Sequence, residues 1–258
     1  MISMSIFIPG LLHNILASTQ EYNLYYDGNG SEEYYMNLIA DAMEPYLTAS
    51  GIAYVRNTPQ MTAASSIQAS NAGNYDVHLA LHSNAAPESL SGQLTGIDVY
   101  YSPNSERGHR LADILAANLK AVYYDPTKVQ TRTTTSIGEV ARTRAPAVLL
   151  ELGYHDNPTD AAWIRANINA IARNLVYSLT EYFGIPFIEP EPISQGTVDI
   201  TSGSLNIRSA PSLSAPVIAS AYDGDTVTIL GEWDGWYVVR YNNLDGYARS
   251  EYITRNYN

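Results

Sequence analysis

A histidine at the end of a buried strand is the first residue of this sequence whose position suggests chemistry. Residues 75–86 read YDVHLALHSNAA, and their apolar positions alternate until the run stops just after His82. This pattern predicts a buried strand that ends at a polar edge. Because ligands bind at the carboxyl ends of strands in open α/β sheets, His82 is a candidate functional residue.

A carboxylate lies inside a second apolar run. Residues 146–152 read PAVLLEL, with Glu151 near the end of the run and Gly153 directly after it. Burying a carboxylate costs free energy unless it is paired or associated with a metal. One interpretation is a core carboxylate bonded to a neighbouring backbone group. The other is a general base whose pKa is tuned by burial.

Two further residues are predicted to reach the same edge of the sheet. His13 follows the first strand, and Glu33 lies in the first turn of the helix that begins at Ser31. Two imidazoles and one carboxylate form a common catalytic zinc set with a position left open for water. A second carboxylate nearby can then take the proton of that water.

The elements that must position these residues alternate between strands and helices up to Phe183. This alternation predicts an α/β fold with a mostly parallel twisted sheet and flanking helices. Pro45 is expected to kink or shorten the first helix. Residues 131–135 are expected to be a loop or an edge, and residues 160–183 one long or two broken helices. Strands are expected at 4–8, 52–56, 96–101 and 146–152, besides the stretch before His82, and further helices at 62–72 and 105–123.

The composition changes after this region. Three prolines fall within residues 184–192, which predicts a stiff spacer. Short strands with turn residues between them follow, and this spacing predicts a small all-β barrel. We therefore expect a catalytic domain at 1–184, a proline-rich linker at 185–196 and a barrel domain at 197–258.

Charge and composition exclude several classes of partner. The 258 residues carry a net charge of -12, which disfavours nucleic acid, and contain no cysteine, so a metal must be held by histidine and carboxylates. No apolar run approaches the ~20 residues of a membrane span. The N-terminal MISMSIFIPG has no basic segment before an apolar one, so no signal peptide is visible in this chain. We expect a monomer.

Three segments of residues 4–183 resemble one enzyme family. LHSNA at 81–85 is similar to the H-x-N-A motif of the zinc-dependent N-acetylmuramoyl-L-alanine amidases of the third amidase family, which hydrolyse peptidoglycan. SEEYYMNL at 31–38 resembles the E-x-x-x-N-L helix of that family. VLLELGY at 148–154, followed by Asn157, resembles its V-L-V-E-x-G-F-x-x-N strand. The resemblance implies that Glu33 and His82 bind Zn²⁺ and that Glu151 is the catalytic base, with Glu32 as the neighbouring alternative to Glu33.

The first metal ligand is where the sequence departs from that family. The family has a G-H pair directly after the first strand, whereas this chain has GLLH at 10–13. His13 is favoured because imidazole binds zinc better than an amide does. Gln20 is the alternative at this position. His78 lies about 13 Å deeper on the strand of His82, given ~3.3 Å per residue, and cannot share the ion.

The C-terminal region resembles a second family. GSLNIRSAPS at 203–212, GEWDGWY at 231–237 and GYA at 246–248 are similar to the signature of bacterial SH3 domains. Such domains are usually modules that bind the cell wall. The alternative is a rigid spacer.

Together the two resemblances imply a secreted or cell-wall-associated peptidoglycan hydrolase. It would cleave the amide bond between N-acetylmuramic acid and L-alanine of the stem peptide by zinc-activated water. Two alternatives remain: a non-catalytic wall-binding protein with a degenerate metal site, and a zinc peptidase that cuts within the stem peptide. Remodelling of the cell's own wall (an autolysin) and lysis by a phage (an endolysin) both fit.

Overall fold

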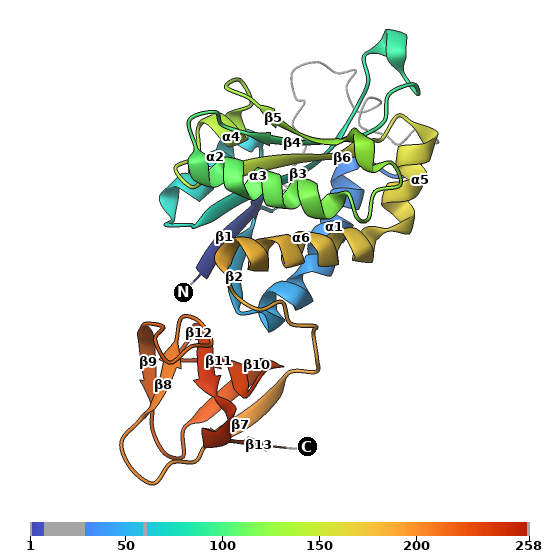
Figure 1. Ribbon diagram of the computed structural model, residues 1–258. Coiled ribbons are helices and arrows are strands. Elements are labelled where there is room, and N and C mark those ends of the chain that lie inside the picture. The colour runs from blue at the N-terminus through green and yellow to red at the C-terminus, as the bar shows by residue number, and fades with distance from the viewer. Residues whose placement is uncertain (1, 8–28, 59–60, 257–258) are drawn as a thin grey trace. The chain divides into compact units, whose positions relative to one another are not determined.

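The structure, a computed structural model, describes residues 2–7, 29–58 and 61–256 (Figure 1). The chain divides into two compact units. One lies within residues 4–182, and the other contains residues 183–258 together with residues 44–53 and the N-terminal end. No described helix is both long and apolar enough to cross a membrane.

A six-stranded sheet of order β2-β1-β3-β6-β4-β5 organises the N-terminal part of the chain. Parallel pairing joins β1 to β3, β3 to β6 and β4 to β5, whereas β4 runs antiparallel to β6. The mostly parallel sheet predicted from the sequence is therefore confirmed. The strands are β1 (Ile2–Phe7), β2 (Ile52–Arg56), β3 (Val77–Asn84), β4 (Ile97–Tyr101), β5 (Val129–Thr133) and β6 (Ala147–Tyr154).

Helices cover the faces of this sheet. Figure 1 shows α3 in front of the sheet, where it packs on β4, β5 and β6. The short α4 packs on β6 and against α2. The helices are α1 (Glu32–Ala49), α2 (Ala63–Ala72), α3 (Glu106–Leu119), α4 (Gly138–Ala141), α5 (Pro158–Ala166) and α6 (Ile168–Phe183).

Three local predictions have clear outcomes. The first helix continues past Pro45 to Ala49, so the proline does not shorten it. The polar segment after residue 130 belongs to β5, which is an edge strand. The helical stretch at 160–183 is broken at Asn167, whose side chain bonds back to the carbonyl of Trp163.

The C-terminal part forms a seven-stranded antiparallel sheet of order β13-β7-β10-β11-β12-β8-β9. Its core is a cluster of aliphatic residues that includes Ile207, Val227 and Val239. The predicted barrel is confirmed in type, and β7 begins at Ser194, inside the range expected to be linker. The strands are β7 (Ser194–Val198), β8 (Leu205–Arg208), β9 (Val217–Ala221), β10 (Thr226–Trp233), β11 (Trp236–Tyr241), β12 (Leu244–Arg249) and β13 (Ile253–Asn256).

Candidate active site

His82 and Glu151 are neighbours across two adjacent strands. In the parallel pairing of β3 and β6, His82 stands opposite Glu151, as the sequence pattern predicts. On the other side of β6, Asp98 of β4 stands opposite Glu151. Residues paired across strands project from the same face of a sheet, so one face carries all three side chains.

Both ring nitrogens of His82 contact carboxylates. Nδ1 lies 3.1 Å from Oε1 of Glu32, and Nε2 lies 3.1 Å from Oε2 of Glu139. Glu32 is the first residue of α1, where the helix dipole favours a negative charge. The backbone N–H of Ser83 also donates to Oε1 of Glu32, at 3.1 Å. The strand end and the helix start are thus joined through one carboxylate.

The structure brings Glu32, rather than Glu33, to His82. Glu32 is buried, in phase with the buried residues Met36 and Ile39 four and seven positions later. Glu33 is half-buried and belongs to the neighbouring face of the helix, because adjacent helical residues are ~100° apart. The resemblance to the E-x-x-x-N-L motif predicts Glu33 as the metal ligand. The helical stripe of apolar residues was the signal that favours Glu32.

The carboxylate of Glu151 is buried and incompletely paired. Its Oε2 has no hydrogen-bond partner among the described residues. Burial raises the pKa of Glu151 to about 8; the nearby His82 opposes this shift, while Glu32, Asp98 and Glu139 add to it. A buried polar atom without a partner is uncommon in native proteins and often has a functional reason. Among the described residues, this oxygen keeps an acceptor position for a water molecule or a substrate group.

Charge attraction stabilises the ionised pair of Glu32 and His82. Burial disfavours the charged form of Glu32, but its bond to His82, the attraction of His82 and His155, and the N–H of Ser83 hold its pKa below the usual value. Burial likewise opposes the His82 cation, but hydrogen bonds to Glu139 and Glu32 hold the pKa of His82 well above the usual 6.5.

The other histidines that the structure describes have different environments. His155 is buried, and its Nδ1 lies 3.0 Å from both the carbonyl oxygen and the hydroxyl of Ser83. His78 is buried deeper on β3, where burial lowers its pKa to about 4. His109 stacks on Tyr101 at the exposed side of α3. The contacts of His155 with Ser83 join it to the end of β3, directly beside the candidate site.

Asp160, which the sequence analysis did not single out, fixes the chain just beyond Glu151. Its fully buried carboxylate accepts the N–H groups of Tyr154 at 2.8 Å and Gly96 at 3.1 Å. It also accepts the hydroxyls of Tyr123 and Tyr124 at 2.5 and 2.7 Å. An acidic residue in the first turn of a helix was the only signal for it in the sequence.

Gly153 allows the irregular end of β6. The pairing of β3 with β6 shifts after His82, and Gly153 has φ +88°. A Cβ at this position would lie 3.1 Å from Oδ2 of Asp160. Irregularities of this kind redirect side chains next to active sites.

The residues present fit part of a zinc site. Nδ1 of His82 and Oε1 of Glu32 are donors of the types that zinc prefers, and they lie close enough to share an ion. Within the described ranges, no three His, Asp or Glu side chains form a group that could hold a metal. His13 and Gln20 lie outside the described residues, so the third ligand stays a prediction.

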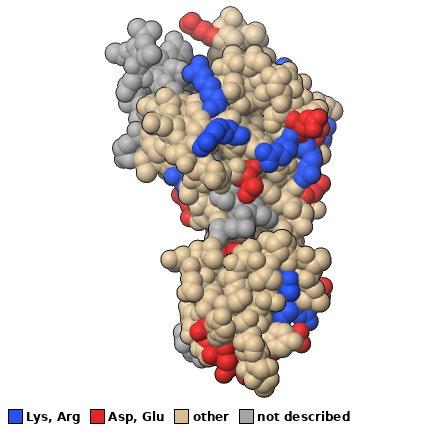
Figure 2. Space-filling model, turned by 90° about the vertical axis from the view of Figure 1, so that its left-hand side faces the viewer, with Lys and Arg blue, Asp and Glu red and all other residues tan. Residues whose placement is uncertain are grey.

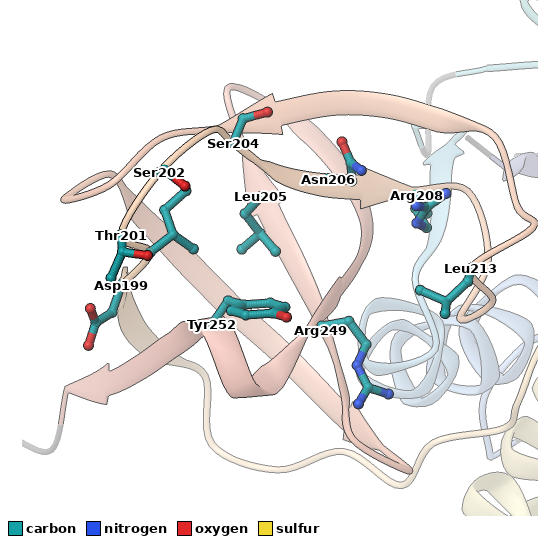
Figure 3. Close-up of a pocket in the computed structure, with 11 residues that line it drawn as sticks. Asp199, Thr201, Ser202, Ser204, Leu205, Asn206, Arg208, Leu213, Arg249 and Tyr252 are labelled. Carbon is teal, nitrogen blue, oxygen red and sulfur yellow. The ribbon is translucent and has the colours of Figure 1, made fainter.

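The C-terminal unit has a groove of its own. A hollow of about 430 Å³ is lined by the apolar surfaces of Leu205 and Tyr252 and by the charged group of Arg249. Figure 3 shows these side chains. Asn206 and Arg208 of β8 also line this hollow. Aromatic, cationic and amide groups together are suited to a polar peptide or sugar.

The surface charge is dispersed. On the face shown in Figure 2, most of the described surface is uncharged, and Lys and Arg lie in small groups with Asp and Glu among them. This face offers no continuous basic tract for a phosphate backbone.

Comparisons with known proteins agree with the two resemblances. A family model described as N-acetylmuramoyl-L-alanine amidase matches residues 21–181, and one described as bacterial SH3 domain matches residues 203–254. No curated protein matches the chain significantly.

Three solved structures with a similar fold are described as amidases or as the catalytic domain of one. An N-acetylmuramoyl-L-alanine amidase from Clostridium difficile 630 is 17% identical, with a TM-score of 0.60, over 71% of this chain and 97% of that one. The amidase AmiC2 of Nostoc punctiforme is 16% identical, with a TM-score of 0.57, over 70% and 97%. The catalytic domain of CwlV from Bacillus (Paenibacillus) polymyxa is 15% identical, with a TM-score of 0.58, over 72% and 100%. The fold predicted from the sequence is thereby confirmed.

Proposed function

We propose that this chain, which belongs to the N-acetylmuramoyl-L-alanine amidase family and also carries a bacterial SH3 domain, is a zinc-dependent peptidoglycan hydrolase. Its reaction is hydrolysis of the amide bond between the lactyl group of N-acetylmuramic acid and L-alanine of the stem peptide. The observation that carries this proposal is the buried oxygen of Glu151, which has no hydrogen-bond partner in the described part of the chain, beside the pair formed by His82 and Glu32.

Glu32 and His82 are the proposed metal ligands among the described residues. His13, or in its place Gln20, supplies the third ligand from outside them. A zinc ion held there would polarise the scissile carbonyl and lower the pKa of its water toward ~7. Glu32 replaces Glu33 in this assignment because, of these two adjacent acids, Glu32 is the one that contacts His82.

Glu151 is the proposed general base. Its raised pKa brings it close to neutral pH, where a group can both take and return a proton. Oε2 of Glu151 accepts a proton from the attacking water and then delivers it to the leaving amine nitrogen. A zinc ion bound by His82 and Glu32 would place a positive charge beside Glu151, which stands opposite His82, and would favour the ionised form of Glu151 before the reaction.

The SH3 domain is proposed to hold the enzyme on the wall. Tethering raises the local concentration of the catalytic domain on an insoluble substrate. The groove lined by Leu205, Arg249 and Tyr252 is the proposed contact surface. The enzyme would therefore act while secreted or associated with the wall.

Digestion of purified peptidoglycan tests the reaction. Mass spectrometry of the products should show free stem peptides that begin with L-alanine. Products in which every muramyl–alanine bond is intact, with cuts inside the stem peptide, would support a zinc peptidase instead. A chain that holds no zinc after dialysis, measured by ICP-MS, and releases no products would be a non-catalytic wall-binding protein.

A further inference from the structure

Glu139 is a buried carboxylate that the proposed mechanism does not yet use. It lies on the four-residue helix α4 and exposes only 4% of its surface. Its Oε2 is 3.1 Å from Nε2 of His82. Burying a carboxylate costs free energy unless it is paired. The contact of Glu139 with His82 therefore indicates a role for Glu139 in the candidate site.

The segment that carries Glu139 is fixed against the sheet. Val140, the next residue, packs with Ala80 of β3 and Leu149 of β6. The turn before α4 is closed by Thr134, whose hydroxyl accepts the N–H of Ile137 at 3.3 Å. Glu139 is therefore held in place by packing, unlike a mobile surface acid.

Glu32 and Glu139 contact different nitrogens of the His82 ring. A neutral imidazole has one N–H donor and one nitrogen with a free lone pair, and only the latter can bind a metal. A carboxylate only accepts hydrogen bonds, so both nitrogens of the metal-free His82 cation donate, one to each carboxylate. Once a metal bound to Glu32 replaces the Nδ1 proton, Glu139 still holds the proton on Nε2. Nδ1, which faces Glu32, is then left with its lone pair.

We propose that Glu139 is a positioning residue, which accepts the Nε2 proton of His82 and thereby presents Nδ1, next to Glu32, as the metal-binding nitrogen. This inference rests on the proposed zinc function. Carboxylates in this role orient histidine ligands in many metal sites, and their loss typically lowers metal affinity about 10- to 100-fold. The rival is that Glu139 is itself a metal ligand on the Nε2 side.

Zinc affinity, measured by competition with a chelating dye, separates these roles in the full chain. Glu139→Met removes the acceptor at similar volume and should weaken zinc binding about 10- to 100-fold. Glu139→Gln keeps an acceptor oxygen for Nε2–H and should stay within about threefold of wild type. Glu106→Met, an exposed acid on α3, should bind zinc as wild type does.

The outcomes are distinct. Unchanged zinc affinity in Glu139→Met overturns the inference and leaves the proposed function intact. Equal losses in the Gln and Met variants overturn it in favour of Glu139 as a ligand. A wild-type chain that binds no zinc overturns the proposed function itself, and the inference with it.

A second measurement needs no variant and covers the case in which Glu139→Met fails to fold. Long-range ¹H–¹⁵N spectra of the zinc-loaded wild-type protein report which nitrogen of each histidine carries a proton. His82 should be protonated at Nε2 and bound to the metal at Nδ1. The opposite pattern overturns the proposal.

Discussion

His82 and Glu151 occupy the same register position on the neighbouring strands β3 and β6, and one oxygen of Glu151 remains unpaired there among the described residues. Both ring nitrogens of His82 contact carboxylates, whereas Oε2 of Glu151 has no hydrogen-bond partner among the described residues. Under the proposed function, His82 binds the metal ion and Glu151 transfers a proton. The following predictions test these two roles.

Glu32 and Glu33 provide a matched pair of variants. Glu32→Gln should lower zinc affinity about 100-fold or more, because a neutral amide replaces a carboxylate ligand. Glu33→Gln should change it less than about threefold, since Glu33 is half-buried on the neighbouring face of the helix and does not contact His82. Both affinities can be measured by dye competition. The reverse order would return Glu33 to the ligand position implied by the E-x-x-x-N-L frame.

Glu151→Gln should separate catalysis from metal binding. Loss of a general base lowers rates about 10²- to 10⁴-fold, so release of stem peptides should fall by that factor. The zinc content should stay at the wild-type level, because Glu151 is not a proposed ligand. Glu106→Gln serves as the control for loss of a carboxylate. A Glu151→Gln variant with wild-type turnover would remove Glu151 from the mechanism.

The stability of the zinc-free protein should depend on pH through Glu151. Its folded pKa of about 8 exceeds the usual 4.5, so the native state binds the extra proton between these values. Stability from this group is full below pH 4.5 and is lost as pH rises through 8. Glu151→Gln should therefore match wild type near pH 4 and be more stable at pH 8, by about 2–4 kcal/mol.

Urea unfolding in the presence of EDTA, repeated from pH 4 to 8.5, measures this difference. Glu106→Gln should follow the wild-type curve throughout, because Glu106 is exposed. A constant gap between Glu151→Gln and wild type at every pH would show that Glu151 does not titrate in this range.

Asp160 should be a stability determinant. Asp160→Ala leaves the buried N–H groups of Tyr154 and Gly96 without their acceptor and should cost about 3 kcal/mol or more. Asp113→Ala, at an exposed ion pair on α3, should stay within about 0.5 kcal/mol. Equal midpoints of thermal unfolding for the two variants would contradict this role.

Two tyrosines of the SH3 domain test the groove. Tyr252→Ala removes an aromatic surface from it and should weaken co-sedimentation of the full chain with purified walls about 5- to 10-fold. Tyr222→Ala removes a more exposed ring outside the groove and should not change wall binding. Equal effects of the two substitutions would place the wall contact elsewhere.

Short-range patterns determined much of this protein. Alternating and continuous apolar runs located β3 and β6, and their polar ends located His82 and Glu151. The same patterns predicted the sheet and the separate C-terminal barrel. A strand buried on one face has alternating apolar residues, and a strand buried on both faces has a continuous apolar run.

Contacts between distant segments were decided only by the tertiary structure. Which of two adjacent acids reaches His82 depends on how α1 is rotated about its axis once its apolar stripe is buried, and that rotation favours Glu32 over Glu33. Glu139 reaches His82 across 57 residues and Asp160 reaches Gly96 across 64. Such pairs have no fixed spacing, so only packing against the sheet brings them together.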